Sequence, residues 1–432
     1  MKEGNRFYFS WIIVSISFIT LALSYGIWYS FSVFLVALLR EFGWSRSIVA
    51  GAFSLFIILH SIIGPFVGGM VDRFGPKRVV LLGSLFLGVG LALSSLIQTW
   101  WQFYIFFGII TAVGVGSTGW VPNTTVIQHW FKRRRGLATG IISSGIGIGI
   151  LVCVPSFQFL IIQVGWRMTY RIMAFFIPLI ISSMTIVFLK RPVQTTSSPQ
   201  IETGISSKVM KDPFIVNVEW TSRSWTVRQA ITTRQFWLLN LSFFLGAFVV
   251  QSILTHHVAF FVDQGLETLL ASFIVSFLGI MSVGGKILWG ALSDKIGREI
   301  TYTIGITCSI CGIIVLIVFS KVPLSFLPYF YAFFFGIGYS VTAVLPPLIT
   351  ADFFEGKAYG GIFGTLQILN GIGGASGAWF AGFLYDQVGS YLPVFIIVIA
   401  GAFCACLSLW CAAPRKIRIV PGKRKHYFEE KP

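Results

Sequence analysis

One stretch of sequence occurs twice and decides the fold: Gly68-Gly-Met-Val-Asp72-Arg73-Phe-Gly75-Pro-Lys77-Arg78 and, in the second half of the chain, Gly290-Ala-Leu-Ser-Asp294-Lys295-Ile-Gly297-Arg298. Each copy follows a long apolar run. The first glycine would let a neighbouring membrane helix approach closely, and the glycine after the aspartate permits a tight turn. The aspartate opposes the dipole at a helix C-terminus, so it should seek a cationic partner. We therefore interpret both copies as folded turns of two related halves, in preference to solvated charged loops.

The relation between the halves extends along the chain. Three further positions recur at nearly the same offset in numbering as the two motif copies: Gly43 as Gly265, Pro122 as Pro346, and Gly165 as Gly389. A duplicated membrane unit is typical of proteins built from two bundles with a binding site between them.

Composition places the chain in a membrane. Hydrophobic residues make up 55% and charged residues 11%, whereas a soluble domain carries roughly 25% charged residues. The mean hydropathy is +0.82. We predict an all-α membrane protein with 12 transmembrane helices in two pseudo-symmetric six-helix bundles, because only helices and closed barrels satisfy their backbone inside lipid. The expected spans are 10–38, 47–71, 79–97, 102–128, 136–163, 169–189, 236–261, 268–292, 301–320, 324–350, 358–384 and 391–413.

One long polar stretch separates six spans from six. We predict an N-terminal bundle over 1–189, a cytoplasmic linker over 190–235, a C-terminal bundle over 236–413 and a basic cytoplasmic tail over 414–432. The first apolar run is too long for a signal peptide, so no cleaved leader is expected.

The distribution of basic residues predicts the orientation. With the N-terminus inside, the inner segments carry 26 lysines and arginines and the outer segments carry 5. The positive-inside rule then puts both termini in the cytoplasm of an inner (plasma) membrane, as a multi-pass protein. The net charge of +17 is explained by these loops, so no nucleic-acid partner is expected, and the lipid bilayer is the main surrounding.

No pattern of catalytic or cofactor-binding residues stands out. All 6 cysteines lie in apolar runs, and Cys308-x-x-Cys311 is interpreted as packing. The glycine-rich run from Gly145 to Gly149 lacks the Lys-Ser/Thr of a phosphate-binding loop. We expect no enzyme activity, no metal and no cofactor.

Lys286 is the one basic residue inside an apolar run. A cation in lipid costs about 2.5 kcal/mol or more and is a functional-site hypothesis by default. Snorkelling to the interface is the alternative. Lys286 lies about 12 Å of helical rise before Asp294, short of the helix end, which favours binding of an anion.

The duplicated motif resembles that of the major facilitator superfamily, and the resemblance covers essentially the whole chain. Three local stretches are similar to the monocarboxylate-porter and oxalate/formate-antiporter branch. They are Glu41-Phe-Gly-Trp44-Ser-Arg46, Trp130-Phe-Lys-Arg-Arg134-Arg135-Gly136-Leu-Ala138-Thr-Gly140 and Gly165-Trp166-Arg167. The resemblance implies two rocking bundles around a central substrate site.

The resemblance also implies roles for particular positions. In that branch an arginine of the eighth span contacts the substrate carboxylate, and Lys286 matches its position. Monocarboxylate porters often carry an aspartate one turn earlier, where this chain has Ser282. The oxalate/formate type carries a lysine in the eleventh span, where this chain offers Gln367 and Asn370. Proton coupling through an Asp–Arg pair is therefore in doubt.

Further polar residues are candidates for completing the site. Tyr25, Tyr29, Asn123, Tyr339, Gln367 and Asn370 are the substrate-binding candidates besides Lys286, although interhelical hydrogen bonds explain them equally well. His60 is the candidate for proton coupling, against a packing role. We expect His256 and His257 to be solvated at the outer end of the seventh span. The gating candidates are Asp72, Arg73, Asp294, Lys295 and Arg134.

The sequence thus predicts a secondary active transporter of small monocarboxylates such as lactate, pyruvate or formate, proton-coupled or anion-exchanging, and functional as a monomer. Its partners would be a small organic anion and, as a candidate co-substrate, protons. Two alternatives stay open. One is another cargo, by oxalate-type dicarboxylate/formate exchange or drug export, and the other is a sensor built on a transporter fold.

Overall fold

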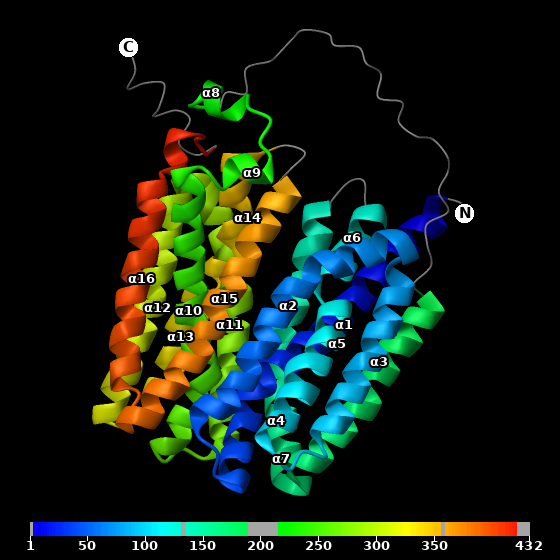
Figure 1. The fold of residues 1–432 in the computed structure, drawn as a ribbon, viewed down its shortest axis with the longest axis vertical. Helices are drawn as coiled ribbons and strands as arrows, with labels where there is room; N and C mark the ends of the chain where they lie inside the picture. The colour runs from blue at the N-terminus through cyan, green and yellow to red at the C-terminus, as the bar shows by residue number, and fades with distance from the viewer. Residues whose placement is uncertain (1–2, 131–134, 189–214, 356–358, 421–432) are drawn as a thin grey trace.

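The computed structural model describes residues 3–130, 135–188, 215–355 and 359–420, and these ranges contain helices and no strand. Figure 1 shows two groups of helices side by side, with both termini at one end of the molecule. We call that end the terminal face and the opposite end the distal face. The two groups converge toward the distal face and diverge toward the terminal face.

The helices of the N-terminal half are α1 (Glu3–Phe42), α2 (Arg46–Phe74), α3 (Pro76–Ser94), α4 (Trp100–Phe103), the π-helix η1 (Tyr104–Thr111), α5 (Ala112–Thr118), α6 (Trp120–Trp130) and α7 (Arg135–Phe188). Those that follow are α8 (Val218–Thr221), α9 (Val227–Ala230), α10 (Arg234–Asp263), α11 (Thr268–Ile296), α12 (Arg298–Lys321), α13 (Leu327–Tyr339), α14 (Val341–Phe354), α15 (Tyr359–Val388), α16 (Leu392–Ala412) and the short η2 (Pro414–Lys416).

Twelve spans follow from these helices. Ten segments of the described chain are long and apolar enough to cross a membrane. One of them, in α7, contains two helices that meet at Gly165 (φ 78°), and α15 adds a further helix of 30 residues. The predicted all-α fold with 12 spans in two bundles is confirmed. The residue limits of the predicted bundles, linker and tail stay a prediction.

Glycines with positive φ occur at equivalent positions of the two halves. In the described ranges they are Gly43, Gly75, Gly165, Gly265, Gly297 and Gly389. The first three lie in the N-terminal half, and the last three are their counterparts, in the same order, in the C-terminal half. Because other residues are strained in this conformation, each pair fixes the same tight turn in both halves.

The fourth span of each half is broken at equivalent points. In the N-terminal half the break lies at Gly119, between α5 and α6, and in the C-terminal half it lies at Ser340, between α13 and α14. Asn123 donates hydrogen bonds to the carbonyl oxygens of Thr118 (2.8 Å) and Gly119 (2.7 Å), which the break would leave without partners. Broken helices inside a membrane bundle are tolerated where such groups are satisfied again.

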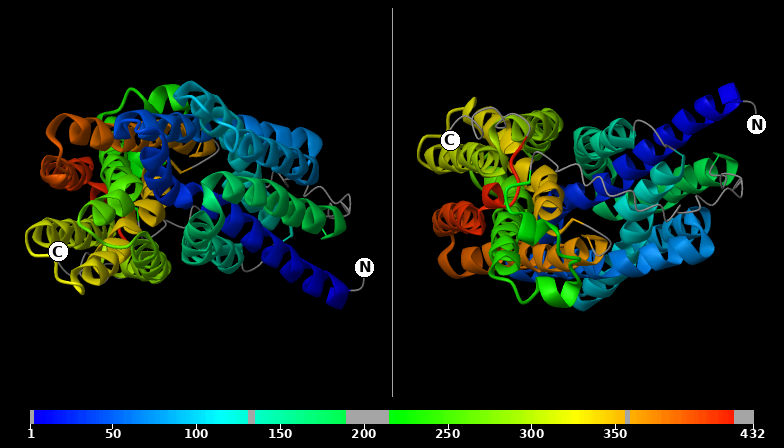
Figure 2. Two further views of the ribbon diagram at one scale, coloured as in Figure 1. Left: turned by 90° about the horizontal axis from the view of Figure 1, so that it is seen from below. Right: turned by 90° about the horizontal axis from the view of Figure 1, so that it is seen from above.

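The two halves meet along α2 and α15, along α7 and α11, and along α1 and α10 (Figure 2). Small residues permit the close approach. The Ser54 hydroxyl donates to the Ala375 carbonyl oxygen (2.7 Å), and a Cβ atom on Gly382 would lie 2.9 Å from the backbone of Arg46. These contacts hold α2 against α15 toward the distal face.

Part of the segment between the halves packs on the C-terminal half. Trp220 donates from Nε1 to the carbonyl oxygen of Phe353 (2.8 Å), and Trp225 packs edge-on against Phe354. Ile215 pairs with Arg418 in an isolated antiparallel bridge. The helices α8 and α9 therefore cover the terminal face of this half (Figure 1).

The positive φ of Gly297 (100°) makes a testable prediction. Gly297→Ala should lower the free energy of unfolding by about 1–2 kcal/mol, because an L-residue is disfavoured there. Thermal unfolding of the purified protein in one detergent measures the change. The matched control is Gly284→Ala, where no atom lies within 4 Å of an added Cβ. Equal melting temperatures for Gly297→Ala and the native protein would contradict the assigned turn.

Candidate functional site

Lys286 lies on α11, half-buried, just past the middle of a 29-residue helix. Among the residues that the structure describes, no carboxylate forms an ion pair with it. The helix approaches α13 closely at the preceding residue, because a Cβ on Gly285 would lie 2.8 Å from the Ile337 carbonyl oxygen. Lys286 thus carries a cation without an ion pair at a point where α11 packs closely on α13.

Hydroxyl groups lie on the same side of α11 as Lys286. Ser282 is one turn earlier and therefore on the same helix face. Its hydroxyl lies beside that of Tyr339 on α13, and neither group completes a hydrogen bond with the described residues. Tyr29 of α1, in the other half, lies in the same region as Tyr339. A cation and two unsatisfied hydroxyls of the C-terminal half therefore lie near the break at Ser340.

His60 lies in an aromatic group of the N-terminal half. Its ring packs edge-on against Trp28 (4.9 Å between centroids) and Tyr25 (6.2 Å) and stacks on Phe56 (6.5 Å). It is half-buried, and its Nε2 lies 3.8 Å from the position of a Cβ on Gly119. His60 is thus next to the break in the fourth span, as Ser282 is next to the break in the tenth.

The remaining candidates differ in what they offer. The amide N–H groups of Asn123 are already committed to the Thr118 and Gly119 carbonyls, which is a structural role. Gln367 and Asn370 are half-buried on α15 and form no hydrogen bond with the described part of the chain. The part of the chain that the structure describes contains no cluster of metal-binding side chains.

The gating candidates of the duplicated motif lie toward the terminal face. Asp294 pairs with Arg298 (2.8 Å), which also binds Asp352 of α14 (2.9 Å). Arg73 and Lys295 are exposed. Arg134 and the side chain of Asp72 lie outside the described residues. Asp294 of the second motif copy thus pairs with Arg298 inside its own bundle. Asp352 is a further partner of Arg298 that was not predicted from the sequence.

The contact that closes the distal face centres on Arg46, at the start of α2. Its guanidinium group binds Asp263 at the end of α10 (2.7 Å) and donates to the Tyr391 hydroxyl (2.6 Å). It also lies over the ring of Tyr385 of α15, 3.8 Å from the centroid. Burial raises the pKa of the Tyr391 hydroxyl well above its usual range, so this group stays protonated. Arg46 therefore ties the N-terminal half to three elements of the other half.

Asp386 of α15 completes this contact. Its carboxylate accepts hydrogen bonds from the backbone N–H groups of Arg46 (2.9 Å) and Ser47 (2.8 Å). Those N–H groups belong to the first turn of α2 and therefore have no hydrogen-bond acceptor within their own helix. A carboxylate there is also favoured by the helix dipole. One half of the protein thus caps a helix of the other.

His256 extends this contact into the C-terminal half, which corrects our expectation for both histidines of α10. His256 and His257 are only 2% and 3% exposed, so the expectation that they are solvated was wrong. His256 donates from Nε2 to the Ala378 carbonyl oxygen (2.9 Å) and accepts from Tyr391 through Nδ1 (3.1 Å). His257 bonds to the Tyr331 hydroxyl (2.8 Å). Tyr391, just before α16, packs against His256, and Tyr331 of α13 packs against His257.

Two helix bundles that meet around a central polar site define the class of secondary transporters. The chain belongs to the Major Facilitator Superfamily, whose model matches residues 17–350.

Relatives support a finer grouping. Monocarboxylate transporter 13 of Bos taurus is 27% identical over 400 residues, covering 91% of this chain and 86% of the relative. Monocarboxylate transporter 2 of Homo sapiens is 25% identical over 432 residues, covering 96% and 87%. A Bacillus subtilis (strain 168) relative, the uncharacterized MFS-type transporter YcxA, is 23% identical over 379 residues, covering 86% and 87%. The predicted resemblance to monocarboxylate porters is confirmed.

Solved structures share the fold. The nucleoside transporter NupG matches with a TM-score of 0.71 at 13% identity, covering 94% of this chain and 100% of that one. A bacterial homolog to the human lysosomal transporter Spinster, in an inward-facing and unoccupied conformation, matches with a TM-score of 0.67 at 16% identity, covering 96% and 97%. The chain is therefore a multi-pass membrane transporter by fold and by family.

Arg46→Gln should loosen the distal face, because it removes an ion pair and a charge-assisted hydrogen bond between the halves. The loss of about 1.5–3 kcal/mol should raise the population with separated distal ends by about tenfold or more. Spin labels at Gln98 and Gln387, one on each half, would measure the separation by double electron–electron resonance in a variant without native cysteines.

The matched control is Arg171→Gln. Arg171 also lies toward the distal face but bonds to Ser95 within its own half (3.4 Å). Its substitution should leave the distance distribution unchanged. An unchanged distribution in Arg46→Gln would show that this contact does not hold the distal face closed.

Proposed function

We propose that this protein moves small monocarboxylates such as lactate, pyruvate or formate across a plasma membrane by alternating access of its two bundles. One observation carries the proposal: Lys286 is a cation inside a spanning helix with no carboxylate partner among the described residues. A substrate carboxylate would supply the missing negative charge. The names of the relatives support the same class of cargo.

The surrounding groups suit a ligand with one carboxylate. Ser282 and Tyr339 have unsatisfied hydroxyls that can bind carboxylate or hydroxyl oxygens, and Tyr29 would contact the ligand from the other half. Lysine offers a point charge in place of the two-pronged contact of arginine. One such cation fits a single carboxylate better than it fits a dicarboxylate.

The proposed orientation puts the terminal face in the cytoplasm, because the sequence segments that join the helices on that side are the richer in basic residues. The distal face is then outside. With Arg46 bound to Asp263 and Asp386, the described arrangement is closed to the outside. The opposite arrangement would break these contacts and bring the terminal ends together. Asp72, Arg73, Asp294, Lys295 and Arg134 are our proposed contacts for that closure.

Lys286→Gln provides the direct test. Loss of a charge-assisted contact of about 1.5–3 kcal/mol should raise the KM for labelled lactate by roughly 10–150-fold in proteoliposomes. Lys286→Arg should keep measurable uptake, because the charge remains. Lys321→Gln is the control, since Lys321 is an exposed cation at the end of α12 and lies outside the proposed site and the proposed gating contacts. Native uptake by Lys286→Gln would contradict the proposal, and counterflow against a panel of labelled acids would identify the cargo.

The unpaired lysine also predicts the kind of transport. An empty carrier must reorient with an uncompensated cation, whereas a loaded carrier is neutralised. A cost of about 2.5 kcal/mol for the bare charge should slow the empty step by more than tenfold. Labelled lactate should therefore enter lactate-loaded vesicles at least about tenfold faster than it enters empty ones. Equal rates in the two vesicle preparations would favour proton symport, in which an empty carrier returns readily.

A further inference from the structure

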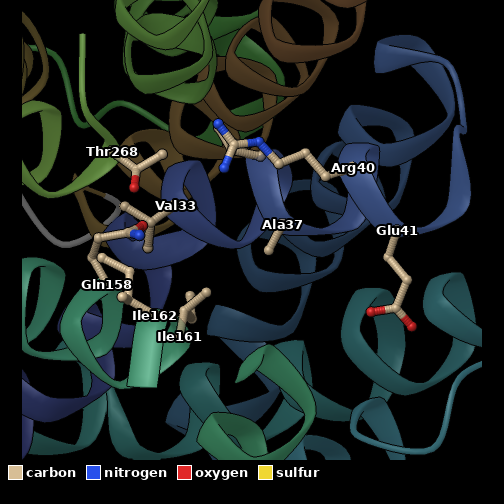
Figure 3. A pocket seen from close by; sticks show the side chains of 9 residues that line it. Val33, Ala37, Arg40, Glu41, Gln158, Ile161, Ile162 and Thr268 are labelled. Carbon is tan, nitrogen blue, oxygen red and sulfur yellow. The ribbon is translucent and has the colours of Figure 1, made fainter. Parts of the chain in front are cut away.

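A pocket lies at the distal face, away from Lys286 (Figure 3). Its volume is about 310 Å³, near the lower end of the range for small-molecule sites. It is lined by α1, by the first part of α7 and by Thr268, the first residue of α11. Thr268 and Lys286 lie on one helix and are separated by roughly 27 Å of rise, so the two sites are distinct.

Arg40 supplies positive charge at this pocket. It lies on the same face of α1 as Val33 and Ala37, which provide apolar lining. Figure 3 shows its guanidinium group extending toward Thr268. Arg40 forms no ion pair with the described residues. The guanidinium group is therefore free to bind an anion.

The start of α11 adds a second attraction for an anion. The residue before it, Glu267, makes no side-chain cap, so the first-turn N–H groups have no side-chain acceptor from that residue. Such N–H groups and the helix dipole together favour a bound anion. Thr268 is the point at which α11 enters the pocket.

Gln158 of α7 is the third observation, and it is independent of the helix end. Its side chain is 3% exposed and lines the pocket, and the described residues give it no hydrogen-bond partner. Figure 3 shows its amide directed toward Val33. Because this amide borders the pocket and donates to no group of the described chain, it is available to a ligand that accepts a hydrogen bond from it.

Glu41, the acidic residue in the pocket lining, does not oppose the binding of an anion there. The Glu41 carboxylate binds Arg167 (2.8 Å) and accepts from the Trp166 ring nitrogen. Figure 3 shows that carboxylate turned away from Arg40. Glu41 is therefore neutralised by its own partners.

The internal repeat indicates what belongs in the pocket. In the register of the repeated turns, Thr268 is the counterpart of Arg46, so the start of α11 corresponds to the start of α2. The start of α2 is capped by the carboxylate of Asp386. The counterpart of Asp386 in the N-terminal half is Ile162, which lines this pocket but carries no acceptor. The protein supplies a carboxylate at one of two equivalent helix starts and leaves the other without one.

We propose that this pocket, formed by Arg40, Gln158 and the start of α11, is a second anion site that binds a carboxylate or phosphate group attached to a short apolar chain. Its ligand is a free small carboxylate or the headgroup of an outer-leaflet lipid. The outer location and the free carboxylate as ligand rest on the proposed function. Because α1 and α7 belong to one half and Thr268 to the other, a bound anion would hold the halves together at this face, as Asp386 does.

Cysteine labelling of the full-length protein tests the site. Thr268→Cys, in a variant without native cysteines and in phosphatidylcholine nanodiscs, should react about tenfold faster with sulfonatoethyl methanethiosulfonate than with its trimethylammonium analogue. Sodium lactate should slow the anionic reagent by about tenfold, because it occupies the same site. Adding Arg40→Gln or Gln158→Leu should reduce the protection to about twofold or less.

Control variants separate this site from the central one. Lys321→Gln removes an exposed cation outside the pocket and should leave the protection intact. Lys286→Gln should also leave it intact, even where transport fails, so a failure of the proposed function is distinguishable from a failure of this site. Protection that appears only in phosphatidylglycerol nanodiscs would assign the site to a lipid headgroup. Labelling that is insensitive to lactate, to phosphatidylglycerol and to Arg40→Gln would overturn the proposal.

Discussion

The constraint that governs this structure is that backbone N–H and C=O groups have no water to bind inside a membrane. Every span is therefore a helix, and every interruption of a helix needs a compensating group. Asn123 satisfies the carbonyls freed at the break near Gly119. At the exposed distal end of α2, Asp386 of the other half satisfies the first N–H groups in the same way. The first of these contacts stabilises one bundle, whereas the second depends on how the two bundles are placed.

That difference explains how far the sequence could predict the structure. The turns at Gly43, Gly75 and Gly165 were predictable, because each has a counterpart in the second half and needs only local backbone geometry. The span count followed from apolar length, and the two-bundle fold followed from the duplicated motif. Local signals repeated in one chain thus suffice for the scaffold.

Contacts between the halves left no comparable signal. Arg46 was visible as the end of the stretch Glu41–Arg46, but its partners Asp263, Asp386 and Tyr391 all lie in the other half of the sequence. The internal repeat does not predict these contacts. It shows which positions of the two halves are equivalent, but not which residues of one half touch residues of the other. His256 was misjudged for the same reason: its burial comes from α15 and α16, which only the assembled bundle brings near.

Of the candidate site, the sequence identified the cation but not its setting. Lys286 stood out because charge is rare in a span, whereas Gln158 did not, because amides in spans usually find partners in neighbouring helices. The side chain of Asn123 was a reasonable candidate until the break at Gly119 supplied it with two acceptors. Polar residues can be identified in a sequence, but whether their hydrogen-bonding groups find partners depends on how the helices pack.

The repeated scaffold also shows why function resides in the departures from symmetry. His60 and Ser282 occupy equivalent positions of the repeat, each next to the broken span of its half, so the scaffold presents both toward corresponding places. Lys286, by contrast, corresponds to Gly64, and a single cation makes the centre of the protein electrostatically one-sided. In the proposed mechanism, an anion held there would be bound mainly by the C-terminal half, while residues such as Tyr29 would contact it from the other. Rocking of the halves would then change access to the ligand without requiring the proposed ion pair to break, because Lys286 belongs to one bundle and would move with it.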